Sequence, residues 1–189
     1  MNKDSHSRAP KLVGDFGEGL ATYLLIRKGF EVAVVDHVGA DLIAERNGKR
    51  YAISVKTRRL GEGETNAATF GPEHIDNIEH FANRFSMDAA LMHIACIEPD
   101  QLIHAFLMKT VDIKSKLKKV KNGYRLNFSK KHLDELVKLD WLDYSVWREE
   151  SIGPAKFFLI TVNKTNFNRP PTTARCRRPP RRCPRLRPA

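Results

Sequence analysis

The sequence predicts a mixed α/β domain in which a helix, three strands, a second helix and further strands follow one another along the chain. Three patterns support this prediction. Apolar residues recur at helical spacing over residues 12–28, Asn47-Gly48 separates two strand-like runs, and Pro72 opens a second amphipathic stretch. We therefore expect an αβββαβ core, with a mixed central sheet flanked by helices.

The expected first helix covers residues 12–28, and Gly29 suits its C-terminal stop. Its large apolar side chains fall on one side, which we expect to face the core: Leu12, Phe16, Leu20, Tyr23 and Leu24. A stripe of mostly smaller residues runs beside them: Gly14, Glu18, Ala21 and Leu25. Gly17 and Gly19 flank Glu18 and would let another group approach it closely. A solvated surface charge is the alternative interpretation of Glu18.

A β-hairpin follows the β-branched strand expected over residues 30–36. Asn47-Gly48 is the strongest short hairpin signal, because both turn positions favour positive φ. The strands should cover residues 40–46 and 49–57. Counting outward from the turn pairs Arg46 with Lys49 and places Asp41 opposite Ser54.

Alternation along these strands predicts two different faces. Asp41, Ser54 and Lys56 share one face. The other face is apolar and should lie toward the core: Leu42, Ala44, Tyr51, Ile53 and Val55. Directly opposed residues lie about 5 Å apart, so a carboxylate should lie beside a hydroxyl with a lysine on the diagonal. Such a group can hold a divalent cation and a phosphate together.

The second half of the chain carries weaker patterns. Residues 58–71 are polar and predict a loop, which Arg58 and Arg59 begin as a basic cluster beside Lys56; a solvated charge run is the alternative. The second helix should start at Pro72 and bury Ile75, Ile78, Ala82 and Phe85. Strands are expected at 88–98, 101–113, 124–128 and 155–162, and a short helix at 130–139. We interpret His93 and His104 as ordinary strand histidines, and the aromatic segment 141–147 as packed on the domain.

Charge is unevenly distributed along the 189 residues. The net charge is +11, but eight arginines and six of the ten prolines lie in residues 169–189. The rest of the chain carries 25 basic against 22 acidic residues, a net charge of +3. We therefore expect a polar N-terminal segment at 1–10, one domain at 11–165, and a disordered Arg/Pro-rich tail at 166–189 that either adds salt-sensitive phosphate affinity or is incidental.

The sequence lacks signals for a membrane or a secreted protein. No apolar run approaches the roughly 20 residues of a membrane span, and the N-terminus has no apolar signal core. Two of the three cysteines lie in the tail without a zinc-type spacing, and Cys96 lies in an apolar run. These observations predict a cytoplasmic protein with no membrane partner.

Three short motifs occur in order along the predicted elements. They are Gly14-Asp15-Phe16-Gly17-Glu18 on the first helix, Gly39-Ala40-Asp41-Leu42 at the second strand, and Val55-Lys56 on the third. Together they resemble the PD-(D/E)XK nuclease superfamily, which has the restriction-endonuclease-like fold. The resemblance covers about residues 11–98, in the style of the Holliday-junction-resolvase-like and Mrr-like branches.

The resemblance implies specific roles. Asp41 matches the family's metal-binding aspartate, Lys56 its catalytic lysine and Glu18 its helix-borne acid, while Val55 would offer a backbone carbonyl to the metal. The implied reaction is hydrolysis of DNA phosphodiester bonds with Mg²⁺ or Mn²⁺, which prefer oxygen ligands. Arg58 and Arg59 are the candidate contacts to nucleic acid.

The sequence departs from the family pattern at Ser54, which stands where the second acid is expected. A hydroxyl brings no charge and is a poorer Mg²⁺ ligand than a carboxylate. In one interpretation the next helix supplies the acid, with Glu73 as the first candidate and Glu79 as the second. In another, Glu18 and Asp41 suffice and Ser54 contacts a metal-bound water. In a third, the site is inactive.

Three functions therefore stay open at this point. The first is a Mg²⁺-dependent DNA endonuclease that uses Glu18, Asp41 and Lys56. The second is an inactive nuclease-fold module that binds nucleic acid, which Ser54 and the arginine-rich tail favour. The third is an assembly domain that forms a homodimer through residues 141–147.

Overall fold

The computed structural model describes residues 5–148 and 158–162. The first half contains α1 Ser5–Arg27, β1 Glu31–His37, β2 Ala40–Arg46, β3 Lys49–Leu60, β4 Ala67–Phe70 and α2 Pro72–Arg84. The second half contains β5 Asp88–Ile97, β6 Leu102–Lys109, α3 Thr110–Lys116, β7 Lys118–Val120, β8 Gly123–Asn127, α4 Lys130–Leu136, β9 Leu142–Arg148 and β10 Phe158–Val162. The tail expected at 166–189 lies outside these residues.

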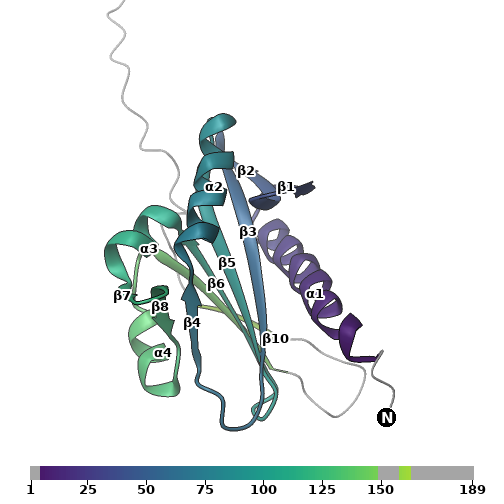
Figure 1. Ribbon diagram of the computed structural model, residues 1–189, viewed down its shortest axis with the longest axis vertical. Coiled ribbons are helices and arrows are strands. Elements are labelled where there is room, and N and C mark those ends of the chain that lie inside the picture. The colour runs from purple at the N-terminus through teal and green to yellow at the C-terminus, as the bar shows by residue number, and fades with distance from the viewer. Residues whose placement is uncertain (1–4, 149–157, 163–189) are drawn as a thin grey trace, which may run out of the picture.

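A seven-stranded sheet forms the centre of the protein (Figure 1), with the strand order β1-β2-β3-β5-β6-β9-β10. Strands β3 and β5 are parallel and are connected through α2, whereas the other neighbouring pairs in this sheet are antiparallel. The described chain thus has the αβββαβ order and the mixed central sheet flanked by helices that the sequence predicts.

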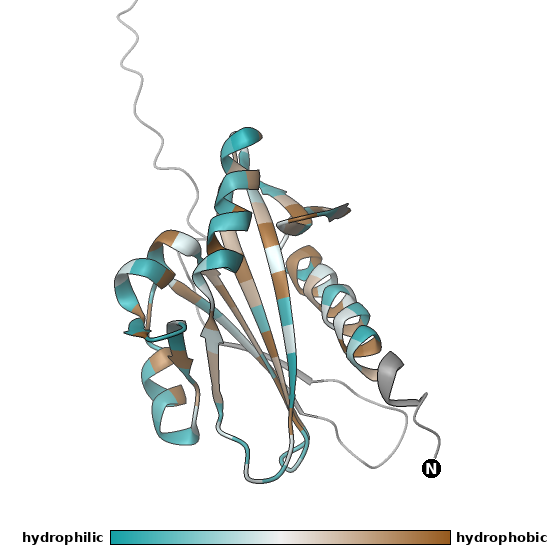
Figure 2. Ribbon diagram, in the orientation of Figure 1, coloured by the Kyte–Doolittle hydropathy of each residue, from teal (hydrophilic) through white to brown (hydrophobic). Residues whose placement is uncertain are grey.

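Helix α1 covers one face of the central sheet, which we call the α1 face. Figure 2 shows apolar and polar residues alternating along β3, as expected for a strand whose side chains point to two faces. The α1 face buries the predicted apolar set of the hairpin together with residues of α1, β5 and β6: Ala21, Leu24, Leu25, Leu42, Ala44, Tyr51, Ile53, Val55, Met92, Ile94 and Leu107.

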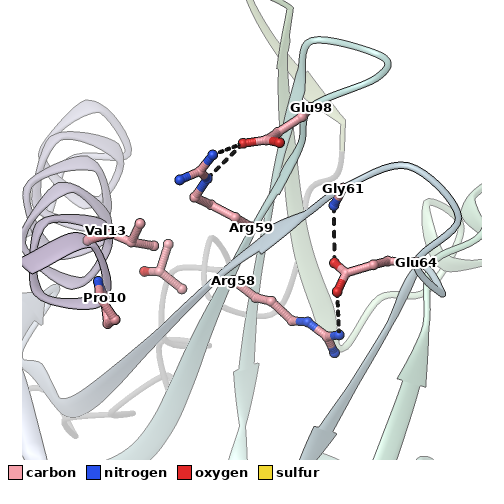
Figure 3. A pocket seen from close by; sticks show the side chains of 9 residues that line it. Pro10, Val13, Arg58, Arg59, Gly61, Glu64 and Glu98 are labelled. Atoms are coloured by element: carbon pink, nitrogen blue, oxygen red, sulfur yellow. Dashed lines mark hydrogen bonds and ion pairs between the residues drawn. The ribbon is translucent and has the colours of Figure 1, made fainter. Parts of the chain in front are cut away.

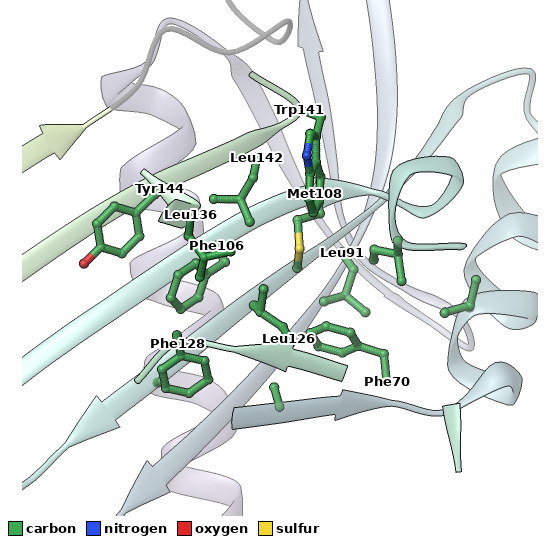
Figure 4. Packing of buried hydrophobic residues seen from close by; sticks show 14 of the residues in the cluster. Phe70, Leu91, Phe106, Met108, Leu126, Phe128, Leu136, Trp141, Leu142 and Tyr144 are labelled. Atoms are coloured by element: carbon green, nitrogen blue, oxygen red, sulfur yellow. The ribbon is translucent and has the colours of Figure 1, made fainter. Parts of the chain in front are cut away.

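The opposite face, the α2 face, is covered by α2 and by a second sheet of three strands in the order β4-β8-β7. Ile78, Phe81 and Ala82 of α2 pack on Ala40 and Ala52. Further along the sheet lies a larger aromatic and aliphatic cluster (Figure 4), which includes Phe70, Leu91, Phe106, Leu126, Phe128 and Tyr144. The three-stranded sheet was not predicted, because β8 pairs not only with its neighbour β7 but also with β4, which is distant in sequence.

Helix α1 differs from the prediction in its length and in its buried side. It begins at Ser5, seven residues earlier than expected. The expected core residues Leu12, Phe16 and Tyr23 are exposed by 65%, 48% and 48%. The side that packs on the sheet is instead Gly17, Ala21, Leu24 and Leu25. Small residues on this side let the helix axis approach the strands closely.

Three other expectations are corrected. Residues 58–71 are not one loop, because β3 continues to Leu60 and β4 begins at Ala67. The strand expected at 101–113 ends at Lys109, where α3 starts. Phe85 is 47% exposed, and Phe81 is buried in its place on α2.

The remaining predicted elements are confirmed. Strand β8 and helix α4 lie where residues 124–128 and 130–139 predict them, and β10 is the late strand. Trp141, Tyr144 and Trp147 are buried within the chain, so residues 141–147 pack on the domain as expected and offer little aromatic surface for dimer formation. Among the described helices, none has the length and apolar character needed to span a membrane.

Candidate nuclease site

The hairpin turn fixes the register of β2 and β3. Asn47 and Gly48 have φ angles of 54° and 75°, the left-handed values that a two-residue turn of this kind requires. The ladder then pairs Arg46 with Lys49 and continues to Leu42 opposite Ile53. One step further out, Asp41 meets Ser54. The register predicted from the dipeptide is therefore confirmed.

The Asp41 carboxylate is held against β3 by two hydrogen bonds to one of its oxygens. Oδ2 accepts from the Ser54 hydroxyl at 3.2 Å and from the Val55 backbone N–H at 2.6 Å. Asp41 is half-buried. Among the described residues, none donates a hydrogen bond to Oδ1. This arrangement fixes the carboxylate and keeps one oxygen available to a ligand.

Ser54 supports Asp41 through this hydrogen bond. It is buried, with 5% exposure, and its hydroxyl donates toward the aspartate. A hydroxyl at this position satisfies a buried carboxylate oxygen without adding a second negative charge beside it.

Lys56 lies two residues beyond Ser54 on the same face of β3. Its side chain is half-buried and lines a cavity of about 230 Å³ together with Arg58, His74 and His93. Its ammonium forms no ion pair with the described residues. Asp41, Ser54 and Lys56 thus lie on one face, as the hairpin pattern predicts.

Glu18 comes from the helix on the other face of the sheet. Its neighbour Gly17 is buried directly against β3, where a Cβ atom would overlap the hydroxyl of Thr57. Thr57 follows Lys56 in the chain, so α1 meets β3 beside the site. Glu18 is itself half-buried and interacts with other residues, so it is not a freely solvated charge.

The two acids expected from α2 are oriented elsewhere. Glu73 is 80% exposed, and its carboxylate lies 3.8 Å from the His74 ring. It does not line the cavity beside Lys56. Glu79 pairs with Lys114 of α3 at 2.5 Å. In this conformation neither carboxylate takes the place of the second acid beside Asp41.

We tested whether the site residues fit a divalent cation. Within residues 5–148 and 158–162, no three His, Cys, Asp or Glu side chains gather closely enough to hold a metal ion together. Mg²⁺ often binds through one or two carboxylates and keeps several waters. Asp41, with Oδ1 available, fits an ion of that kind. The Val55 carbonyl and Glu18 stay predictions from the family resemblance.

Arg58 and Arg59 lie on strand β3, so their side chains point to opposite faces. Figure 3 shows Arg59 directed at Glu98 and Arg58 at Glu64. The Arg59 Nε atom donates to Glu98 at 2.7 Å, and the Arg58 guanidinium lies 3.7 Å from Glu64. Both arginines border an open groove of about 670 Å³ beside Pro10 and Val13. The basic cluster is therefore balanced by two carboxylates.

His93 is a site residue that the sequence did not reveal. The parallel register of β3 and β5 places it directly beside Lys56. It is 3% exposed, and burial lowers the pKa of His93 to about 4; the backbone of Lys56 opposes this shift and the charge of Arg58 adds to it. The pairing of β3 with β5 leaves no local signal in the sequence, unlike the turn at Asn47-Gly48.

Comparison with known proteins shows a weak likeness to solved structures. No family model and no curated protein matches the chain. A Holliday junction resolvase from Archaeoglobus fulgidus superposes with a TM-score of 0.44 at 15% identity, covering 60% of this chain and 87% of that chain. At this level of similarity, the function of the resolvase is not transferred to this chain. The functional interpretation rests on the order of motifs in the chain and on the geometry around Asp41 and Lys56.

Proposed function

We propose that the protein is a metal-dependent endonuclease that hydrolyses phosphodiester bonds in DNA. One observation carries this proposal: Asp41 is anchored to β3 with one oxygen available, and Lys56 lies on the same face two residues beyond the serine that anchors it. The resemblance of the three motifs to the PD-(D/E)XK nucleases supports the same conclusion.

Asp41 is the principal metal ligand in this proposal. Oδ1 would bind the ion, and the hydrogen bonds from Ser54 and Val55 to Oδ2 hold the carboxylate in one orientation. Glu18 and the Val55 carbonyl are the other candidate ligands. When bound, Mg²⁺ or Mn²⁺ would polarise the phosphate and lower the pKa of water.

Lys56 acts on the phosphate. Its ammonium donates hydrogen bonds to a non-bridging phosphate oxygen, where negative charge develops as the attacking oxygen approaches phosphorus. The half-buried position of Lys56 strengthens this interaction, because fewer waters screen the charge there.

Cleavage and metal binding test the proposal together. Purified protein is incubated with supercoiled plasmid and with branched DNA, in Mg²⁺ or in EDTA, and the Asp41→Ala and Lys56→Met variants are assayed beside it. We expect cleavage in Mg²⁺ that both substitutions abolish. Calorimetric titration with Mn²⁺ should show one site that Asp41→Ala removes. Cleavage that survives Asp41→Ala would assign the activity to a contaminant.

An inactive nucleic-acid-binding module is the second candidate. The observation that favours it is the hydroxyl of Ser54 in place of an acid, together with the exposed position of Glu73. This candidate predicts salt-dependent DNA binding that Asp41→Asn leaves unchanged, and no turnover with Mg²⁺ or Mn²⁺. Any cleavage that depends on Asp41 would exclude it.

A further inference from the structure

The cavity beside Lys56 is built from four elements on the α2 face. Lys56 and Arg58 come from β3, Thr69 from β4, His74 from α2 and His93 from β5. Its volume of about 230 Å³ is several times the roughly 30 Å³ of one water molecule. It is smaller than the roughly 300 Å³ at which drug-sized pockets begin. The cavity therefore suits a small chemical group.

The lining of this cavity favours an anion. Lys56 and Arg58 bring two cationic side chains, and Thr69 and His74 add polar atoms. Among the described residues that line it there is no Asp or Glu. His74 lies in the first turn of α2, whose N-cap residue Gly71 has no side chain to cap the helix. The His74 and Ile75 N–H groups donate to the Gly71 carbonyl and Pro72 has none, so α2 offers a phosphate oxygen mainly the positive end of its dipole.

His93 supplies an independent observation. Its side chain is part of the cavity wall, and neither ring nitrogen has a hydrogen bond of normal geometry among the described residues, although the Lys56 backbone interacts with the ring and opposes the fall in the pKa of His93. Phe70, Phe106 and Phe128 surround the rest of the ring. A buried polar group without a partner destabilises a fold, so a phenylalanine would be the better residue here if the position served packing alone.

We propose that this cavity binds a phosphate group, with Arg58 and Lys56 providing the charge and the neutral His93 imidazole donating a hydrogen bond from the wall. The identification of this group as part of a nucleic-acid strand rests on the proposed function, whereas the phosphate site itself does not. Free inorganic phosphate is the other ligand that would present the same group to the cavity. Arg58 is available to this group because its exposed ion pair with Glu64, at 3.7 Å, is weak.

The test compares two histidines. His93→Phe removes the proposed donor, and His104→Phe makes the same change at a buried histidine on β6 that does not line the cavity. Affinity for a fluorescent oligonucleotide is measured by anisotropy in EDTA, where no cleavage occurs. We expect His93→Phe to weaken binding about tenfold or more, and His104→Phe to leave it unchanged. Equal affinities for the two variants would overturn the assignment of the phosphate to a nucleic-acid strand.

Arg58 provides a second arm that does not depend on His93→Phe folding. Arg58→Gln should reduce the slope of log affinity against log salt by about 0.7 to 0.9, as expected for one lost phosphate contact. Arg84→Gln makes the same change at an exposed arginine in the last turn of α2, which does not line this cavity. Equal slopes for the two glutamine variants would contradict the binding of a nucleic-acid phosphate by Arg58.

A third arm separates the two sources of phosphate. Unfolding temperatures of the wild type, His93→Phe and His104→Phe proteins are measured with inorganic phosphate and with chloride at equal ionic strength. If phosphate raises the unfolding temperature of the wild type and of His104→Phe but not that of His93→Phe, the site is confirmed. If His93→Phe also leaves oligonucleotide affinity unchanged, the source is free phosphate. No stabilisation of the wild type and no effect of His93→Phe on oligonucleotide affinity would overturn the site. Because these assays contain no Mg²⁺, they are independent of whether the protein cleaves DNA.

Discussion

The two faces of the central sheet are built from different chemistry. The α1 face buries mostly aliphatic side chains, together with Phe30, Tyr51 and Trp147, and its buried ion pair joins Lys28, just after α1, to Asp143 of β9. The α2 face buries Ser54 beside Asp41, packs His93 and His104 among aromatic rings, and encloses the cavity beside Lys56. The difference indicates that the α1 face serves mainly stability, while the α2 face gives up some stability to position polar groups.

The ion pair on the α1 face should have the largest effect on stability. Lys28 Nζ lies 2.5 Å from Asp143 Oδ1, and their side chains are 9% and 1% exposed. Asp143→Asn leaves a buried ammonium without its partner, so we expect a loss of about 3–5 kcal/mol in the free energy of unfolding. Urea denaturation measures this.

A double variant is the control for that prediction. Lys28→Met with Asp143→Leu replaces both charges by apolar groups and should recover most of the stability. If Asp143→Asn costs less than about 1 kcal/mol, the pair is no more important than an exposed one.

The buried histidines make the stability of the α2 face depend on pH. Burial lowers the pKa values of both His93 and His104 to about 4. The unfolded chain, with histidine pKa values near 6.5, binds more protons between pH 6.5 and 4 than the folded protein does. The free energy of unfolding is therefore highest above about pH 6.5. It falls as the pH is lowered to 4, by about 3 kcal/mol for each histidine.

His104→Phe isolates one of these contributions. Denaturation curves at pH 7, 5.5 and 4 should show that this variant loses about 3 kcal/mol less than the wild type across the range. His104 Nδ1 also lies 2.7 Å from the Tyr144 hydroxyl, so the variant has a lower stability at neutral pH. If the free energy of unfolding falls by the same amount from pH 7 to pH 4 in both proteins, the lowered pKa of His104 is contradicted.

The contact between α1 and β3 should give a smaller effect. Gly17→Ala places a methyl group on the Thr57 hydroxyl, and we expect it to cost about 1–3 kcal/mol. Gly19→Ala lies two residues away on α1, where the added methyl meets nothing within 4 Å, and should stabilise the helix by up to about 1 kcal/mol. Thermal unfolding of the two variants measures the difference.

Thr57, the residue of β3 that Gly17 contacts, provides the control. Thr57→Ala removes the hydroxyl and should restore part of the stability of Gly17→Ala. If Gly17→Ala and Gly19→Ala have the same unfolding temperature, α1 does not approach β3 as closely as described.

The sequence predicted those parts of the site whose geometry depends on residues close together in the chain. Asn47-Gly48 sets the register between β2 and β3, and this alone brings Asp41 to Ser54 and places Lys56 on the same face. His93 could not be found in this way, because the parallel pairing of β3 and β5 depends on how α2 returns the chain to the sheet. The pairing of β4 with β8 is likewise non-local, so the three-stranded sheet could not be predicted either.

The orientation of α1 shows a second limit of sequence patterns. Its large apolar residues Leu12, Phe16 and Tyr23 predicted the buried side, but the side with Gly17 and Ala21 packs on the sheet. Close approach of the backbone to β3 favours small residues, which a search for large apolar residues overlooks. The acid expected from α2 fails similarly, because residue type alone does not show that Glu73 points to solvent.

The central claim is that the carboxylate anchored between Ser54 and Val55 supports phosphodiester cleavage. The most direct measurement is the rate of plasmid cleavage in Mg²⁺ by Asp41→Asn and by Asp88→Asn, the same change at a 54% exposed carboxylate on β5. We predict that Asp41→Asn loses more than about a hundredfold in rate, while Asp88→Asn cleaves like the wild type. Equal rates for the two variants would contradict the account.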